Sequence, residues 1–262
     1  MKNLSTRTKA WINLMAFLIS LGVNTLGALG QFNGMSQKAV SDKYHTLTTP
    51  APITFSIWSV IYLLLLITLI VMIIKAKDKA YKKMIDILSP IFLISCIFNI
   101  LWIVSFSYEK IGISTLLIFG LLFSLTTINK KLLQHKREIP YRLASITFGL
   151  YAGWVTIATV VNIASYLVSI SWNGLGIEPI IWAPMTLIIS LVIVTAIMMN
   201  LKNALYSLPV AWEFFGILME IDRLADSLNY GPYMKPVIMV GIFFLLFLSI
   251  KQFKQNNYDV II

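Results

Sequence analysis

The side chains of this sequence best suited to bind a ligand are aromatic and amide residues that repeat at helical spacing inside long apolar runs. One set is Phe55, Trp58 and Tyr62, spaced i, i+3 and i+7, so the three residues share one face of a helix. Two further sets have the same character: Asn99, Trp102 and Phe106, and Trp154, Ala158 and Asn162, with Tyr151 three residues before Trp154. We expect these faces to point into a helix bundle, because a buried amide is costly toward lipid and needs a hydrogen-bond partner.

These aromatic faces have two interpretations. Aromatic stripes at helical spacing are usually packing, and asparagine inside a membrane often serves as a hydrogen bond between helices. Three stripes that each combine a large flat ring with a polar group favour instead a cavity for a flat apolar ligand.

Glu213 is a second candidate for chemistry, because it is a carboxyl near the middle of an apolar segment. A charged carboxylate at the centre of a bilayer costs about 3 kcal/mol, so such residues are commonly functional. We regard Glu213 as a candidate intramembrane proton site. The alternative is that it is protonated or paired within the bundle and only orients its helix.

Other catalytic chemistry finds little support in the sequence. We find no nucleophile motif, phosphate-binding loop or paired-carboxylate spacing, and therefore predict no catalytic residue. Cys96 is the single cysteine, and His45 and His135 are isolated from other ligands. We predict no disulfide and no metal site, since a metal needs three or four convergent ligands.

The elements that must position these residues are membrane helices. Of the 262 residues, 58% are hydrophobic and 12% are charged, whereas a soluble domain carries about a quarter charged residues. None of the apolar runs alternates with period two, which favours helices over a barrel. At about 20 apolar residues per span, the predicted segments are Trp11–Gly30, Ile53–Ile74, Ile87–Phe106, Ile111–Ile128, Leu143–Ile170, Ile180–Leu201, Ala204–Met219 and Pro232–Ile250.

The net charge of +10 indicates the orientation of these segments. Lys2, Arg7 and Lys9 precede the first segment, and further lysines and arginines fill the connections 75–83 and 130–142. Because cytoplasmic loops are enriched in Lys and Arg, we predict that both termini are cytoplasmic and that the chain lies in the plasma membrane. The same asymmetry explains the basic clusters without a nucleic acid partner.

Three segments resemble the translocator protein / tryptophan-rich sensory protein (TspO/MBR) family. Residues 44–62 (YHTLTTPAPITFSIWSVIY) resemble its first loop and second helix, residues 99–106 (NILWIVSF) its third helix, and residues 151–162 (YAGWVTIATVVN) its fifth. The resemblance covers roughly residues 10–172. Leu150 and Ser56 stand where the family usually has proline, and the sterol motif of mammalian members is not evident, which argues against sterol binding.

The resemblance implies a five-helix bundle with a pocket that binds tetrapyrroles such as protoporphyrin. On the matching positions, Trp58 and Trp154 would be the pocket tryptophans linked in the family to porphyrin binding and light-dependent porphyrin breakdown. Asn99, Trp102 and Tyr44 would be lining residues. Three added segments resemble a longer bacterial branch of the family.

We therefore predict an all-α integral membrane protein, with a five-helix core at residues 1–172 and a carboxy-terminal extension of about three helices at residues 173–262. The expected function is binding of a flat apolar ligand, foremost a porphyrin, in a sensory, regulatory or porphyrin-handling role. The expected partners are the lipid bilayer and this ligand, with no required cofactor and a homodimer left open. The alternatives are a proton-coupled transporter that uses Glu213 and a structural membrane subunit. The candidate ligand-binding residues are Trp58, Trp154, Asn99, Trp102, Tyr44, Tyr62, Phe55 and Asn162.

Overall fold

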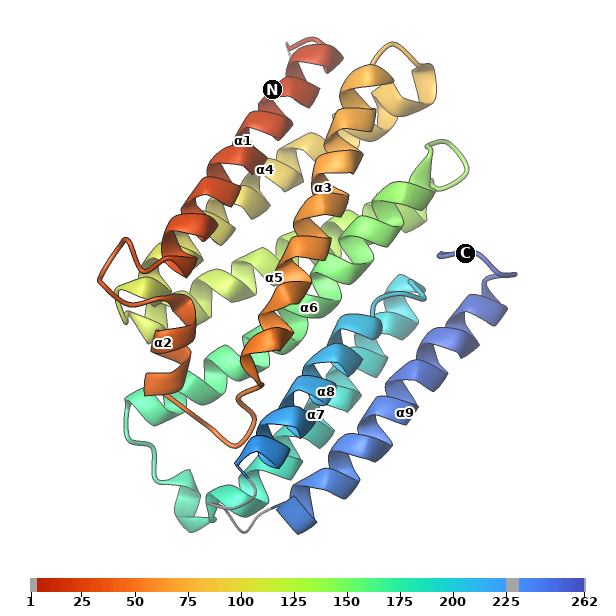
Figure 1. Cartoon of the computed structure of the whole chain (residues 1–262). Coiled ribbons are helices and arrows are strands. Elements are labelled where there is room, and N and C mark those ends of the chain that lie inside the picture. The colour runs from red at the N-terminus through yellow and green to blue at the C-terminus, as the bar shows by residue number, and fades with distance from the viewer. Residues whose placement is uncertain (1–3, 225–230, 262) are drawn as a thin grey trace.

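The computed structural model describes residues 4–224 and 231–261, which form a helical bundle without a strand in these ranges (Figure 1). This confirms the predicted all-α membrane fold. The α-helices are α1 (Thr6–Ala28), α2 (Gln37–Lys43), α3 (Ile57–Ile74), α4 (Lys79–Ser107), α5 (Ile111–His135), α6 (Tyr141–Ser169), α7 (Pro179–Leu201), α8 (Leu208–Arg223) and α9 (Gly231–Gln255). Two short 3-10 helices, η1 (Pro52–Ser56) and η2 (Gly174–Gly176), precede α3 and α7.

Seven helices of the described chain are long and apolar enough to cross a membrane, and they coincide with seven of the eight predicted segments. The remaining predicted segment, Ala204–Met219, corresponds to α8, which begins and ends four residues later. With 16 residues, α8 is about 24 Å long, which is shorter than the hydrocarbon core of roughly 30 Å. The helix in the seventh predicted segment is therefore too short to cross the whole hydrocarbon core.

One end of the bundle gathers the basic connections, and we call it the basic end. Lys9 near the start of α1 pairs with Asp86 in α4 at 2.7 Å. Arg142 at the start of α6 pairs with Asp259, which follows α9, at 3.1 Å. The chain therefore begins and ends at the same end of the bundle, as Figure 1 also shows. This arrangement agrees with the predicted segregation of basic residues, of which Lys2 lies outside the described residues.

Helix α8 carries the chain back across the bundle. The side-chain amide of Asn256 donates a hydrogen bond of 2.8 Å to the carbonyl of Lys202, so α7 and α9 both end at the basic end. Since α9 must begin at the other end, the chain between α7 and α9 crosses the bundle, and α8 lies along this path in Figure 1. Helix α8 thus returns the chain to the end of the bundle from which α9 starts, although it is shorter than the seven candidate membrane spans. The cytoplasmic location of both termini stays a prediction.

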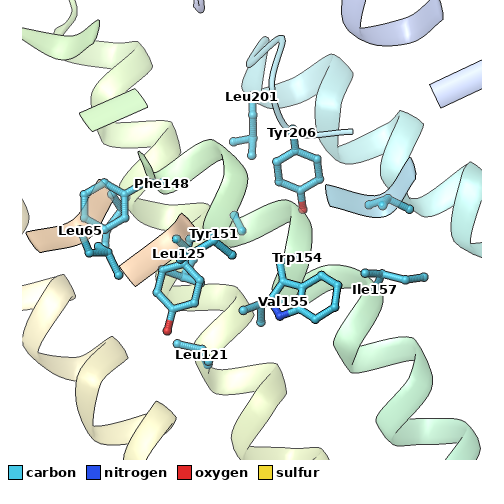
Figure 2. Close-up of a cluster of buried hydrophobic side chains, with 14 of the residues drawn as sticks. Leu65, Leu121, Leu125, Phe148, Tyr151, Trp154, Val155, Ile157, Leu201 and Tyr206 are labelled. Atoms are coloured by element: carbon cyan, nitrogen blue, oxygen red, sulfur yellow. The ribbon is translucent and has the colours of Figure 1, made fainter. Parts of the chain in front are cut away.

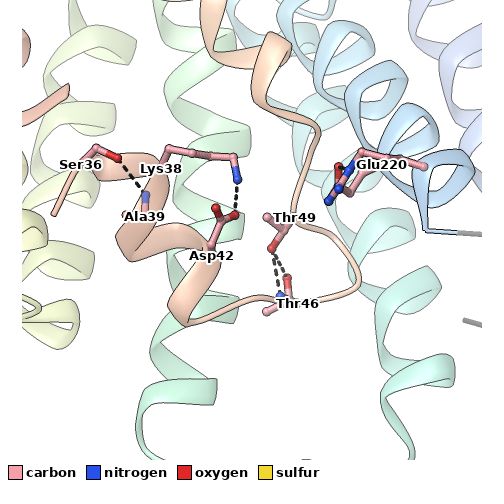
Figure 3. A network of polar contacts seen from close by, with 8 residues as sticks. Ser36, Lys38, Ala39, Asp42, Thr46, Thr49 and Glu220 are labelled. Atoms are coloured by element: carbon pink, nitrogen blue, oxygen red, sulfur yellow. Dashed lines mark hydrogen bonds and ion pairs between the residues drawn. The ribbon is translucent and has the colours of Figure 1, made fainter. Parts of the chain in front are cut away.

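Helix α2 lies at the opposite end and was not predicted, because seven residues are too few to show a periodic pattern. The hydroxyl of Ser36 caps the helix by accepting a hydrogen bond of 3.1 Å from the amide of Ala39, as Ser commonly does at this position. Lys38 pairs with Asp42 one turn later (Figure 3). The helix thus forms an ordered cover over this end.

Helix α6 is the centre of the bundle, and its contact with the segment before α8 depends on glycine. A Cβ atom added at Gly153 would lie 2.0 Å from the carbonyl oxygen of Tyr206. Tyr206 is fully buried, and its hydroxyl lies 2.5 Å from that of Thr156 on α6. Figure 2 shows Tyr206 reaching toward α6 close to Trp154. The carboxy-terminal helices therefore pack on the predicted core at backbone distance, and the predicted boundary after residue 172 stays a prediction.

Candidate functional site

A cavity of about 60 Å³ lies near the opposite end of the bundle, among α2, α3, α4, α6 and α8. We call it the tryptophan cavity. One water needs about 10–15 Å³ measured in this way, so the cavity has room for a few waters or one small chemical group. Its lining residues are Gln37, Ser41, Pro50, Phe55, Trp58, Trp102, Ile103, Phe106, Trp154, Ala158, Val161, Asn162, Ser165 and Glu213.

Trp58 is the point at which the three predicted aromatic faces meet. Its ring stacks on Tyr62 of the same helix with centroids 5.1 Å apart. Trp102 of α4 is 6.1 Å away. Trp154 and Tyr151 of α6 meet Trp58 edge to face at 6.0 Å and 5.9 Å. The structure therefore brings five aromatic residues of the three faces into one cluster around Trp58.

Asn99 belongs to the hydrogen bonds between helices rather than to the cavity lining. Its side-chain oxygen accepts hydrogen bonds from Ser20 at 2.8 Å and from Asn24 at 2.5 Å, both on α1. Its amide nitrogen donates to the hydroxyl of Tyr151 at 3.1 Å. The structure thus gives this amide the role of joining α1, α4 and α6, which is the packing interpretation of its stripe.

Asn162 lines the cavity and also holds Trp102 in place. The indole N–H of Trp102 donates to the side-chain oxygen of Asn162 at 3.0 Å. The amide nitrogen of Asn162 donates to Ser114 at 3.1 Å and to Thr115 at 2.8 Å on α5. With both ends of the amide engaged, Asn162 fixes the position of one aromatic wall.

Three other polar side chains of the cavity have a buried atom with no hydrogen-bond partner among the described residues. These atoms are Nε2 of Gln37, Nε1 of Trp154 and one carboxyl oxygen, Oε2, of Glu213. Trp154 and Glu213 are only 3% and 2% exposed. Because an unpaired buried polar group costs about 1–3 kcal/mol, such atoms mark a place where a ligand or water completes the hydrogen bonds.

Glu213 reaches this cavity because α8 docks against η1. The amide of Ala51 donates to the carbonyl of Gly216 at 3.0 Å, and the indole of Trp212 donates to the carbonyl of Thr54 at 2.9 Å. The sequence placed Glu213 near the middle of an apolar segment, and the structure buries it inside the bundle, where it is 2% exposed. No sequence signal joins Glu213 to the tryptophans, because the docking depends on backbone groups of segments far apart in the chain.

A larger groove of about 470 Å³ lies beside the cavity, between α1 and α3 under α2. Gln37, Phe55 and Trp58 line both spaces. These side chains therefore form a partition with the cavity on one face and the groove on the other. Tyr62 lines the groove but not the cavity, whereas Trp58 on the same helix lines both spaces.

Tyr44 lies apart from both spaces, although the resemblance implied a lining role for it. Its hydroxyl donates to a carboxyl oxygen of Glu109 at 2.9 Å, and Lys43 pairs with the same carboxyl. Hydrogen bonds from Lys43 and then Tyr44 lower the pKa of Glu109. Lys38 is likewise paired with Asp42 (Figure 3). Lys38 and Lys43 are thus both engaged in ion pairs at this end of the bundle.

A third hollow of about 450 Å³ lies between the end of α6 and the start of α7. Trp172 and Trp182 line it, with ring centroids 5.2 Å apart. Here the indole N–H of Trp182 is satisfied by the carbonyl of Gly174 at 2.7 Å. This hollow contains none of the predicted site residues, and the unpartnered groups described above belong to the tryptophan cavity.

A family model described as TSPO-like protein matches residues 10–257. This range takes in the carboxy-terminal helices α7, α8 and α9 as well as nearly all of the predicted five-helix core. Searches of curated proteins and of solved structures returned no match.

Proposed function

We propose a function from the following premise: this chain belongs to the TSPO-like protein family and is a multi-pass membrane protein. The proposed function is that it binds a flat apolar small molecule at Trp58 and Trp154. The first ligand class to test is the tetrapyrroles, which the TspO/MBR resemblance implies. Binding would serve a sensory, regulatory or porphyrin-handling role. The proposed location is the plasma membrane, with both termini in the cytoplasm.

The observation that supports this proposal best is the partition made by Trp58. Pockets for drug-sized ligands measure about 300–1,000 Å³, so the groove of about 470 Å³ is large enough and the cavity of about 60 Å³ is not. A flat ring system in the groove would lie against Trp58 and Phe55. Rotation of Trp58 would join the groove to the cavity and expose the unpaired indole N–H of Trp154 to the ligand.

The test is a titration of the reconstituted protein with protoporphyrin, followed by quenching of tryptophan fluorescence. Loss of one aromatic contact is worth about 0.5–1.5 kcal/mol, so Trp58→Phe and Trp154→Phe should each weaken binding about two- to tenfold. Trp11→Phe is the matched control, because Trp11 is 47% exposed on the outside of α1. Unchanged affinity in both cavity variants would remove this site. Illuminating the complex and following its absorbance tests the secondary activity, light-dependent breakdown.

Proton-coupled transport is the second candidate, and the burial of Glu213 with an unpartnered oxygen is the observation in its favour. Among the described residues that line the tryptophan cavity, however, Glu213 is the one ionisable side chain. A proton path needs further groups to receive the proton, so the geometry favours binding. Equal proton flux into vesicles containing the native protein and Glu213→Gln would end the transport hypothesis.

A further inference from the structure

We propose that the tryptophan cavity receives a protonated amine, and that the carboxylate of Glu213 is its counter-ion. This inference rests on the proposed binding of a flat apolar molecule at Trp58 and Trp154, and it favours a cationic ligand over a porphyrin, whose charged groups are carboxylates. The ligand class is an amphipathic cation, in which a compact ammonium group is attached to a flat apolar body.

The charge of the cavity is the first argument. Glu213 is 2% exposed, and its Oε2 atom has no partner among the described residues. No other acidic or basic side chain contributes to the described lining. Because buried charges in proteins are paired or coordinated, a single unpaired carboxyl fits a ligand that brings one positive charge and a hydrogen-bond donor.

The walls of the cavity are the second argument. Phe55, Trp58, Trp102, Phe106 and Trp154 all line it. The faces of aromatic rings attract cations, tryptophan most strongly, and cages of such rings bind ammonium groups. A carboxylate group of a ligand would instead meet both the negative ring faces and Glu213. The cavity therefore discriminates in favour of a cation and against an anion.

The sizes of the two spaces are the third argument. The cavity, at about 60 Å³, accepts an ammonium group and excludes a ring system. The groove, at about 470 Å³, lies on the other side of Phe55 and Trp58 and suits the apolar body. The ligand would therefore bind in one orientation, with its amine toward α8 and its rings between α1 and α3.

The experiment uses fluorescent probes that share one flat body, namely 1-aminomethylpyrene, which is a cation at neutral pH, and the uncharged 1-pyrenemethanol. Binding is measured to the full chain in nanodiscs, with empty nanodiscs subtracting partition into lipid. The native protein should bind the amine at least about tenfold more tightly than the alcohol, which is the effect of one hydrogen bond between charged groups. Glu213→Gln should abolish this preference, so that the variant binds the amine and the alcohol with similar affinity.

The control is Glu220→Gln on the same helix, because Glu220 is already paired with Arg223 at 2.5 Å and does not line the cavity. This variant should keep the preference. If Glu213→Gln does not fold, Glu213→Asp retains the charge and should keep a reduced preference. Binding of the alcohol without any preference for the amine in the native protein refutes the inference alone. Failure of both probes to bind the native protein refutes the proposed function as well.

Discussion

The docking of α8 on α6 can be tested by adding a single methyl group at Gly153. The new Cβ would lie 2.0 Å from the carbonyl oxygen and 3.0 Å from the carbonyl carbon of Tyr206. Both are backbone atoms, so α6 and the segment before α8 must separate by more than 1 Å to reach ordinary contact. Overpacking of this kind costs about 1–3 kcal/mol, against a gain of about 1 kcal/mol from replacing glycine by alanine in a helix.

Gly22→Ala is the matched control, since nothing lies within 4 Å of a Cβ at that position of α1. The control should gain up to about 1 kcal/mol from helix propensity alone. Unfolding of both purified variants in mixed micelles, followed by circular dichroism, should separate them by about 1–3 kcal/mol. The Gly153 variant should also bind the amine probe more weakly, because α8 carries Glu213. If Gly153→Ala is as stable as Gly22→Ala, the close packing described here is incorrect.

Three further outcomes are expected. Asn162→Leu should lower the free energy of unfolding by about 1–3 kcal/mol, because it leaves the indole N–H of Trp102 unpaired. Adding Trp102→Phe should recover part of this loss, and no recovery would contradict the hydrogen bond between Trp102 and Asn162. Because the pKa of Glu109 is lowered by Lys43 and Tyr44, the ion pair stabilises α2 at neutral pH and this support is lost as the pH falls through the lowered pKa. Hydrogen exchange in α2, corrected for intrinsic rates, should therefore accelerate in acid, and Glu109→Gln should abolish that change. Reporters fused before α1 and after the carboxy terminus should both read as cytoplasmic, and opposite readings would exclude an even number of crossings.

The aromatic part of the site could be predicted from spacing because each stripe lies within one helix. Trp58, Trp102 and Trp154 each belong to a face that repeats with the helical period, and the structure brings these faces together. Such periodicity identifies which side chains point inward. It does not show whether an inward amide lines a cavity or joins helices, and Asn99 has the second role.

The position of Glu213 could not be predicted, because it depends on contacts between segments with no shared pattern. The position of α8 is fixed by a hydrogen bond from the backbone amide of Ala51 to the carbonyl of Gly216, and by the close approach of Gly216 to Thr54. The sequence shows a carboxyl in an apolar run, which suggests function by default. Only the packing of α8 on η1 shows that the carboxyl and the tryptophans belong to one cavity.

The cavity is assembled in a fixed order during synthesis of the chain, because its residues come from segments far apart in the sequence. Synthesis proceeds from the amino terminus, so Trp58 and Trp154 enter the membrane before Glu213 leaves the ribosome. Helix α8 is short and turns its carboxyl inward, so it gains a stable place only against helices already inserted. A nascent chain that stops after α7 would hold the tryptophans without the carboxyl. The proposed selective binding would therefore require the chain through α8.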